Sequence, residues 1–439
     1  MPSQQITAKV PTTFLGYLRS MGPGIVIALV WLGAGDLVDS AVAGGNYGYT
    51  LMWALALALF VRFTFVSIIA KYQLCNQHGE NVLAGMRRIH RCVPWLVGIA
   101  GLVFAHIYNA FSLRGVGESM SQLTGWGNPF VWSTFWAAVA ALIVFRGGFE
   151  HIKKLFYVFL GLLSISLLGV AIWSGPNPVE MARGMMLFAI PEQHGPYGVF
   201  LLLTSLIGAV GGSIANLLYP YFIEQNGWKG PRFRRVQLYD LAFGTLVVVI
   251  LNLAVWTVGA EVLKPGGIEV TDLQSLANLI TVVLGKWCGP LFYLGIFAAT
   301  YSTVVGNATG YGLLCSDAAR YWRRTSGESS APTGPVNIQQ STVYRWVVAW
   351  CLISPLVWSL PGMPDFVTLT IVGNAVSVVV LPLLSAALWY ITARTSCIGA
   401  QYRNRWWENC LMAILFALSV WSTYLFIERF VTWIFPMIT

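Results

Sequence analysis

The sequence is dominated by long apolar runs that recur along the whole chain. Between Gly24 and Val431, runs of roughly 18 to 28 residues are separated by short polar breaks, and each run is long enough for a helix that crosses about 30 Å of hydrocarbon. Hydrophobic residues make up 56% of the chain and charged residues only 10%, whereas about a quarter of a soluble protein is charged. The sequence therefore predicts an all-α polytopic membrane protein that lies in a lipid bilayer.

The apolar runs predict eleven membrane-spanning helices, and the basic residues predict their orientation. Short cytoplasmic loops collect Lys and Arg; with the N-terminus inside, 20 of the 26 basic residues fall in cytoplasmic segments, five fall outside and Arg62 falls within the second span. We therefore expect a multi-pass protein of the cell membrane with a cytoplasmic N-terminus, an external C-terminus and no cleavable signal peptide. The predicted span centres lie near residues 38, 60, 103, 139, 162, 209, 248, 299, 352, 376 and 416.

Several functional classes are excluded by what the sequence does not contain. The net charge of +9 comes from basic residues in loops beside apolar spans, where the anionic cytoplasmic leaflet attracts them, so we expect no nucleic-acid partner. No phosphate-binding loop, zinc-protease motif or nucleophile elbow occurs. We therefore expect no enzyme activity and no cofactor, and a monomer formed by a single transmembrane transporter domain over residues 1–439.

The first predicted span is interrupted near its centre. Gly33, Ala34 and Gly35 are followed directly by Asp36. A carboxylate at membrane depth costs roughly 2.5 to 3.5 kcal/mol even on the mildest scale, so it usually marks a functional site. Irregular backbone survives in a membrane only where it lines a cavity or is buried in protein. The span is therefore predicted to be a broken helix.

The sixth predicted span has a similar cluster at its middle, formed by Gly208, Gly211, Gly212 and Ser213, with Asn216 beyond it. Glycine-interrupted spans at corresponding positions of two halves point to the binding site of transporters with inverted repeats. We expect repeats at about 20–175 and 196–393 and an extra helix at about 406–434. The alternative is that these glycines are small-residue helix contacts, which leaves Asp36 beside Gly35 unexplained.

The sequence resembles the NRAMP family of divalent-metal transporters over most of its length. GPGIVIAL and AGGNYGYTLMWALALAL resemble the family's first two helices, LGKWCGPLFYLGIFAATYSTVVGNATGYG its eighth, and NAVSVVVLPLL its tenth. The resemblance implies a LeuT-like fold in which helices one to five and six to ten are inverted repeats with an eleventh appended. It also implies alternating access to a site near the midplane.

The sequence departs from the family at the motifs that bind metal. Typical members carry DPGN where this chain has Gly33 to Asp36, and an MPH stretch where it has Gly212 and Ser213. The family's sixth-helix histidine and the acidic relay of its third helix have no counterpart, so proton coupling by that route is not expected. His106 in the third span could replace a relay member, although a packing role is favoured.

The resemblance places the candidate metal ligands on Asp36, the carbonyls of Ala34 and Gly211, and Asn374, which corresponds to the family's tenth-helix glutamine. The wider substrate site adds Gly33, Gly212 and Ser213, with Asp39 and Asn216 behind it or in a vestibule; Asp39 is equally compatible with an N-cap. Oxygen donors suit Mg²⁺, Ca²⁺ and Mn²⁺, and Mg²⁺ keeps several waters when bound. We therefore predict Mg²⁺ or Mn²⁺, partly hydrated, as cargo.

A second interpretation is a remodelled cavity that carries an organic cation or another small organic solute. Asp36 would supply the negative charge, and aromatic residues would supply cation–π contacts. The candidates are Trp31, Tyr219, Tyr221 and Tyr301. Two further alternatives are a sensor and a relative that has lost transport. The short loops offer no output domain for a sensor.

Overall fold

The computed structural model describes residues 10–11, 16–17, 23–24, 27, 31, 34–146, 149–192, 197–211, 213–323 and 340–438, and these are almost entirely helical. The helices before the sixth span are α3 (Ala34–Tyr47), α4 (Met52–Cys75), α5 (Val82–Arg87), α6 (Cys92–Thr124), α7 (Pro129–Arg146), α8 (Phe149–Trp173) and α9 (Pro178–Met186). The sixth span comprises α10 (Val199–Leu206), the π-helical turn η1 (Ile207–Gly211), the 3₁₀ turn η2 (Ile214–Leu218) and α11 (Tyr219–Gln225). The rest comprises η3 (Pro231–Phe233), α12 (Arg234–Val258), η4 (Gly259–Leu263), α13 (Leu273–Leu284), η5 (Lys286–Cys288), α14 (Gly289–Arg323), α15 (Thr342–Ile353), η7 (Ser354–Ser359), α16 (Phe366–Val376), η8 (Ser377–Val380), α17 (Leu381–Ala393), α18 (Thr395–Ile398), η9 (Ala400–Tyr402) and α19 (Trp406–Ile438).

The predicted spans correspond to helices. Each of the eleven predicted centres lies within a helix or helical turn of the described chain. Eight helical stretches are long and apolar enough to cross a membrane, and α8 with α9 makes a ninth if this pair, bent by 106°, is counted as one span. The remaining two predicted spans correspond to shorter elements: α3, and α15 continued by η7. The all-α class is confirmed.

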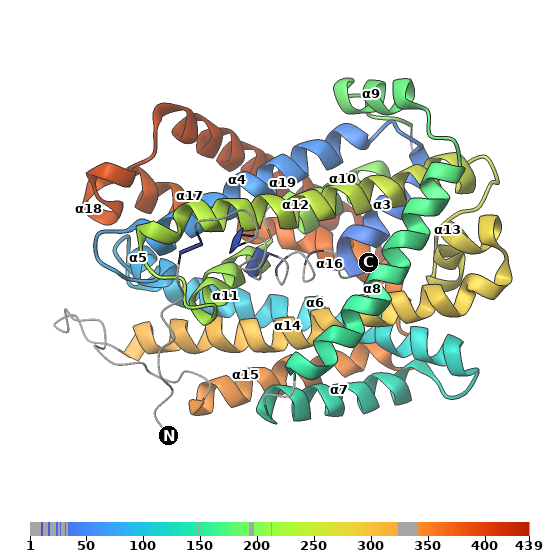
Figure 1. Ribbon diagram of the computed structural model, residues 1–439, viewed down its shortest axis with the longest axis horizontal. Helices are drawn as coiled ribbons and strands as arrows, with labels where there is room; N and C mark the ends of the chain where they lie inside the picture. The colour runs from blue at the N-terminus through green and yellow to red at the C-terminus, as the bar shows by residue number, and fades with distance from the viewer. Residues whose placement is uncertain are drawn as a thin grey trace.

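Small residues allow the longest helices to pack closely. α6 and α14 run side by side across the molecule (Figure 1). A Cβ added at Gly98 would lie 2.8 Å from the Ala318 Cβ, and one at Gly101 would lie 3.0 Å from the Cys315 Sγ. Membrane helices associate through such contacts because lipid gives no hydrophobic drive between helices. α7 and α15 pack against this pair on the lower side in Figure 1.

α3 lies in the middle of the molecule, packed against α12, η4 and α16. The approach to α12 is close: a Cβ at Gly44 would lie 2.4 Å from the Trp256 carbonyl oxygen. Only glycine fits there without a shift of backbone. This packing fixes α3 next to the interrupted sixth span, where the cavity described below is found.

The sixth span is interrupted as the glycine cluster predicts. α10 passes into the π-helical η1, Ser213 has extended backbone (φ −48°, ψ 141°), and the chain resumes as the 3₁₀ turn η2. A Cβ at Gly208 would lie 2.1 Å from the Asn374 carbonyl oxygen, so glycine lets η1 approach α16. Gly212 lies outside the described residues, as does Gly33 at the predicted break of the first span.

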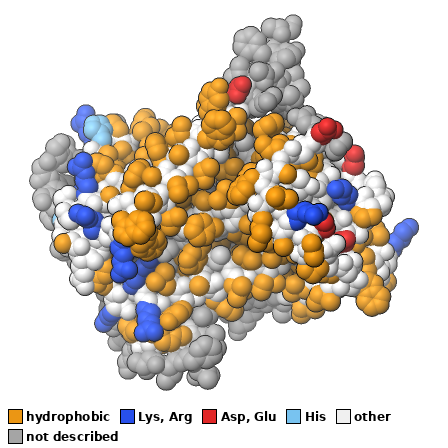
Figure 2. Space-filling view, turned by 90° about the horizontal axis from the view of Figure 1, so that it is seen from above, with side chains coloured by type: hydrophobic (Ala, Val, Ile, Leu, Met, Phe, Trp, Pro, Cys, Tyr) orange, Lys and Arg blue, Asp and Glu red, His pale blue; other side chains and the backbone are white. Residues whose placement is uncertain are grey.

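The surface matches a membrane environment. Figure 2 shows a broad band of hydrophobic side chains between two more polar ends, with Lys and Arg gathered at one of them. Large exposed apolar side chains in the described chain include Phe60, Leu142, Ile165, Leu246 and Ile250. Apolar patches of this extent on a protein mark contact with lipid or a partner. Which side of the membrane each end faces stays a prediction.

Candidate substrate site

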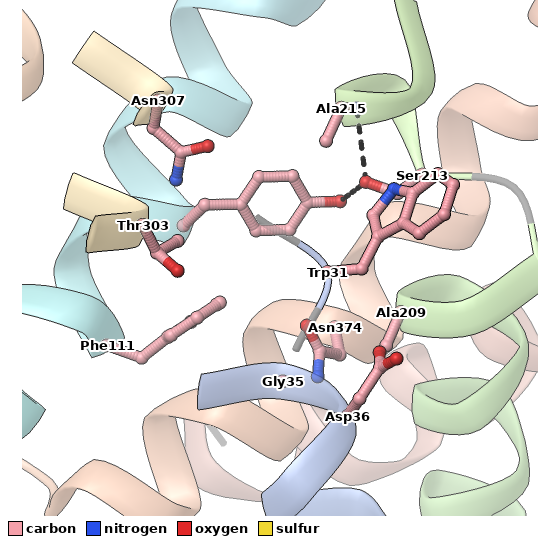
Figure 3. Close-up of a pocket in the computed structure, with 11 residues that line it drawn as sticks. Trp31, Gly35, Asp36, Phe111, Ala209, Ser213, Ala215, Thr303, Asn307 and Asn374 are labelled. Carbon is pink, nitrogen blue, oxygen red and sulfur yellow. Dashed lines mark hydrogen bonds between the residues drawn. The ribbon is translucent and has the colours of Figure 1, made fainter. Parts of the chain in front are cut away.

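A small cavity lies between α3, η1, α6, α14 and α16. Its volume is about 40 Å³, large enough to hold water. Figure 3 shows side chains from distant parts of the chain converging on it. The lining residues are Trp31, Gly35, Asp36, Tyr108, Phe111, Ala209, Ser213, Ala215, Thr303, Asn307 and Asn374.

The Asp36 carboxylate at the edge of this cavity is paired with Arg62. The two guanidinium nitrogens Nη1 and Nη2 donate to Oδ2 at 2.6 Å and to Oδ1 at 2.9 Å, and both side chains are only 1% exposed. Two parallel N–H···O bonds between charged groups are among the strongest pairs that side chains form. Because the charges cancel, the pair leaves no net charge beside the cavity.

Arg62 also reaches the interrupted sixth span. Its Nη2 donates to the Ala209 carbonyl oxygen at 2.6 Å. Ala209 belongs to the π turn η1, and such turns often mark functional sites. The guanidinium carbon lies 4.8 Å from the centre of the Trp31 ring. One side chain of α4 therefore binds both α3 and the interrupted sixth span.

Neighbouring polar residues hold Asp36 further. Asn252 of α12 donates its amide N–H to Asp36 Oδ2 at 3.3 Å, and its amide oxygen accepts a 2.7 Å hydrogen bond from Ser40. Asp36 thus accepts from two helices besides its own. These bonds fix the carboxylate toward Arg62 rather than toward a free ion.

Hydroxyl groups meet at the other side of the cavity. The Tyr108 hydroxyl lies 2.6 Å from the Ser213 hydroxyl, and the backbone N–H of Ala215 donates to Ser213 Oγ at 3.2 Å. Ser213 therefore caps η2 and also joins the sixth span to α6. The Trp31 indole N–H donates to Asn216 at 3.0 Å, which is a second link between the first and sixth spans.

Asn307 presents an unpaired acceptor to the cavity. Its amide nitrogen donates to Asn109 at 3.1 Å, while its Oδ1 is buried and has no hydrogen-bond partner in the described chain. A buried acceptor without a partner costs about 1 to 3 kcal/mol. This atom is therefore placed to accept a hydrogen bond from a water or from a bound solute.

Asp39 lies one turn beyond Asp36 and contacts the cavity only through a neighbour. Its Oδ1 accepts from the Ser205 hydroxyl at 2.6 Å, and its Oδ2 accepts from the Asn374 amide nitrogen at 3.1 Å. The Asn374 nitrogen is thus used, which leaves its oxygen as the end that can serve a ligand. Asp39 lies inside α3 and caps no helix, so the N-cap alternative is wrong.

The structure brings together part of the predicted site. Asp36, Ser213 and Asn374 line the cavity, while Asp39 and Asn216 stand behind it as partners of Asn374 and Trp31.

The two predicted backbone ligands stand at the ends of helical elements. Ala34 begins α3 and Gly211 ends η1, and a role for their carbonyl groups in ligand binding stays a prediction. The predicted residues Gly33 and Gly212 lie outside the described residues.

The predicted aromatic residues separate into two groups. Trp31 lines the cavity, but Tyr219, Tyr221 and Tyr301 do not. The Tyr219 hydroxyl donates to Asp240, and the Tyr221 hydroxyl donates to Asp317. These three tyrosines, named as candidates for cation–π contact with an organic cation, therefore do not face this cavity. Trp31 itself already packs on the Arg62 guanidinium.

The donors fit a bare divalent cation poorly. Both oxygens of Asp36 are taken by Arg62, and a metal on the same carboxylate would be repelled by the guanidinium beside it. Within the ranges that the structure describes, no group of three or more His, Cys, Asp or Glu side chains is arranged to hold a metal. The described arrangement offers neutral hydrogen-bonding groups and aromatic walls instead.

Two residues at the cavity, Arg62 and Asn307, were not among the predicted site residues. For Arg62, the sequence does contain an indication. A lone arginine inside an apolar span needs an anionic partner, and Asp36 in the adjacent span is the available one. Asn307 was expected only to join helices, which its nitrogen does. Whether its oxygen faces the cavity depends on how α14 is rotated about its axis, and the sequence does not show that rotation.

Fold and site together define a class: a helical membrane transporter of LeuT-like architecture, in which a buried site lies beside an interrupted span. Within that class, residues 24–428 match the model of the Nramp family, described as natural resistance-associated macrophage protein-like. The chain belongs to this family, which consists of transporters and not enzymes. The resemblance seen in the sequence is thereby confirmed.

Relatives and solved structures agree with this assignment. The chain is 24% identical over 298 residues to the divalent metal cation transporter MntH of Erwinia tasmaniensis, covering 66% of this chain and 70% of the relative. It superimposes with a TM-score of 0.76 on a mutant of the manganese transporter of Eremococcus coleocola, at 16% identity, covering 96% of this chain and 89% of the other. MhsT in complex with L-phenylalanine gives a TM-score of 0.53 at 15% identity, with 92% and 97% covered.

Proposed function

We propose that this protein is a secondary transporter of the cell membrane that works by alternating access and carries a small organic solute with no net charge. The cargo binds in the cavity between α3, η1, α6, α14 and α16. Residues of about 20–175 and 196–393 form the two inverted repeats, and the helix at about 406–434 is appended to them. The protein acts as a monomer in the lipid bilayer, with a cytoplasmic N-terminus and an external C-terminus.

The observation that carries this proposal is the ion pair between Asp36 and Arg62. The resemblance to the family suggests a ligand beside the interrupted sixth span, but here the carboxylate that lines the cavity is paired with an arginine. A carboxylate paired with an arginine has little attraction for a bare cation in a medium of low dielectric constant. The site suits a neutral or zwitterionic solute.

The lining supports recognition by hydrogen bonds and apolar contact. Asn307 Oδ1 offers an acceptor, Asn374 and Ser213 offer polar groups, and Phe111 and Trp31 offer aromatic surface. Small-molecule sites combine largely apolar walls with a few such polar groups. Because the cavity is only about 40 Å³, a solute larger than a few waters requires the surrounding helices to move apart, as alternating access does.

A divalent cation is the second candidate, and the family favours it. The relative from Erwinia tasmaniensis is named a divalent metal cation transporter, and the oxygen donors of the site suit Mn²⁺ or partly hydrated Mg²⁺. For this chain to bind such an ion at Asp36, Arg62 has to withdraw. His106, the possible proton relay, is engaged with Ser354 and Trp358, which supports the expectation that family-type proton coupling is absent.

A ligand screen followed by uptake tests the proposal. Purified protein is heated with amino acids, small amides, nucleobases and polyols, and separately with Mn²⁺ and Mg²⁺, because a ligand of the native state raises the melting temperature. Solutes that stabilise the protein are then tested for uptake into proteoliposomes. We expect Asn307→Ala to reduce that uptake about tenfold or more, since an acceptor facing the solute is lost. Asn278→Ala on α13, away from the cavity, is the matched control.

Each outcome decides between the two candidates. Stabilisation and uptake of an organic solute that depend on Asn307 would support the proposal. Stabilisation by Mn²⁺ or Mg²⁺ with uptake of that ion, and no response to any solute, would replace it with the metal assignment.

A further inference from the structure

The Arg62 guanidinium lies between the first turn of α3 and the interrupted sixth span. It binds the Asp36 carboxylate in the first turn of α3 and the Ala209 carbonyl in η1. In transporters built from broken helices, coupling cations are coordinated by such unwound backbone carbonyls and nearby oxygen groups. The positive charge that joins these elements is here supplied by a side chain.

From these contacts we infer that Arg62 is a built-in cation that takes the place of a coupling ion, so that transport requires no inorganic cation. The inference rests on the proposed function as a transporter, and it adds how the site is energised. The solute moves down its own gradient or in exchange for another solute. A divalent or monovalent ion from solution is neither needed nor admitted at Asp36.

The chemistry of arginine makes this occupancy permanent. A guanidinium stays charged in proteins and presents a planar fork that matches a carboxylate. Because it is tethered to α4, its effective concentration at Asp36 is far above that of an ion in solution. Its stem comes from an apolar helix, so the charge can leave Asp36 only for another partner within the protein.

The surroundings oppose a second cation at the same place. Trp31 already stacks on the guanidinium, with 4.8 Å between the guanidinium carbon and the ring centre. Asn252 donates a hydrogen bond to Asp36, which uses a further lone pair of the carboxylate. An added ion would have to displace these contacts and also overcome repulsion from Arg62.

A substitution that removes the guanidinium should convert the site into one that responds to cations. Arg62→Ala leaves the Asp36 carboxylate and the Ala209 carbonyl without their donor and opens the volume of a guanidinium. We expect this variant to have a lower melting temperature, and we expect millimolar guanidinium chloride to restore several degrees of it. Mn²⁺, Mg²⁺ and Na⁺ are tested in parallel, whereas the melting temperature of the unmodified protein should not respond to any of the four.

Two controls separate rescue from general salt effects. Arg183→Ala removes the arginine of an exposed pair, with Glu180 at 3.0 Å, leaves no buried vacancy, and should show no such rescue. The double variant Asp36→Asn with Arg62→Gln removes both charges and should be insensitive to all four cations. If Arg62→Ala does not fold, the response of this double variant to the cations is compared with that of the unmodified protein.

The results bear on the inference separately from the proposed cargo. Rescue of Arg62→Ala by guanidinium, absent from both controls, would support the inference even if no solute is identified. Stabilisation of the unmodified protein by a metal ion, lost in Asp36→Asn, would overturn it. So would a folded Arg62→Ala that keeps the melting temperature of the unmodified protein, or solute uptake by the unmodified protein that stops when inorganic cations are replaced by an impermeant organic cation.

Discussion

The Tyr108 and Ser213 hydroxyl groups lie 2.6 Å apart and join α6 to the point where the sixth span loses its helical form. Ser213 at the same time accepts the backbone N–H of Ala215 and so begins η2. A movement of the sixth span relative to α6 has to break this bond. The pair therefore links the shape of the interruption to the helix that forms the opposite wall of the cavity.

Replacing the Tyr108 hydroxyl should affect transport more than stability. Tyr108→Phe removes one hydrogen bond, which in a membrane protein is worth about 0.6 kcal/mol, so the melting temperature should change little. The Ser213 hydroxyl loses its fixed partner, and uptake of the cargo should fall severalfold. Proteoliposome uptake measured together with thermal unfolding checks this. Equal losses in both would mean that the bond is only structural.

The Asp36–Arg62 pair should show strong energetic coupling. Removing either partner leaves a buried charge without compensation, which costs about 3 to 5 kcal/mol. We expect Asp36→Ala and Arg62→Ala each to be destabilised by that amount, and the double variant to be destabilised by less than the sum, with a coupling energy of about 0.5 to 3 kcal/mol. Unfolding in denaturant for the four proteins measures it. Strict additivity would contradict the pairing.

The close approach at Gly208 predicts a steric effect. A methyl group added at this position would lie 2.1 Å from the Asn374 carbonyl oxygen and 2.5 Å from the Ser377 hydroxyl, so Gly208→Ala forces η1 and α16 apart at a cost of about 1 to 3 kcal/mol. The cavity between these elements should be distorted, and cargo uptake should be lost. Gly161→Ala on α8, where nothing lies within 4 Å of an added Cβ, is the control and should change neither quantity.

The remaining ion pairs should differ according to burial. Lys71 of α4 is buried and donates to Asn404 and Glu408 at 2.7 Å each, so it ties α4 to the start of α19. Lys71→Ala should destabilise the protein by about 1 to 3 kcal/mol because Glu408 and Asn404 lose their donor. Arg183→Ala breaks an exposed pair with Glu180 and should change little. Melting temperatures of the two variants should therefore separate clearly.

The span pattern of the fold could be predicted because hydrocarbon imposes it. A helix that crosses lipid must be apolar over its whole length, so the eleven centres were readable, and the glycines at 208 and 211 together with Ser213 marked the interruption that the structure shows. Contacts between neighbouring helices were harder to predict. Whether Arg62 turns toward Asp36 or toward lipid depends on the rotation of α4, although the cost of an unpaired arginine at that depth already favoured a partner.

Part of the site could also be predicted from the sequence. Ser213 could be placed because it stands at the interruption of the sixth span, and Asp36 and Asn374 because their positions resemble the family's motifs. Asn307 and Tyr108 come from helices without interruptions, and only the packing of α6 on α14 and η2 turns them toward the cavity. The divalent cation predicted from the oxygen donors agrees with the divalent metal cation transporters among the relatives; the organic solute that we propose instead rests on the charge of Arg62.

Metal uptake tests most directly whether the pairing of Asp36 with Arg62 keeps a bare divalent cation from being carried. Proteoliposomes that contain the unmodified protein are given Mn²⁺ or Mg²⁺ with an inside-negative potential, with Asp36→Ala as the comparison. The structure predicts that neither ion enters faster than into protein-free vesicles. Entry of either ion that Asp36→Ala abolishes would contradict the proposal and show that Arg62 yields its place to metal.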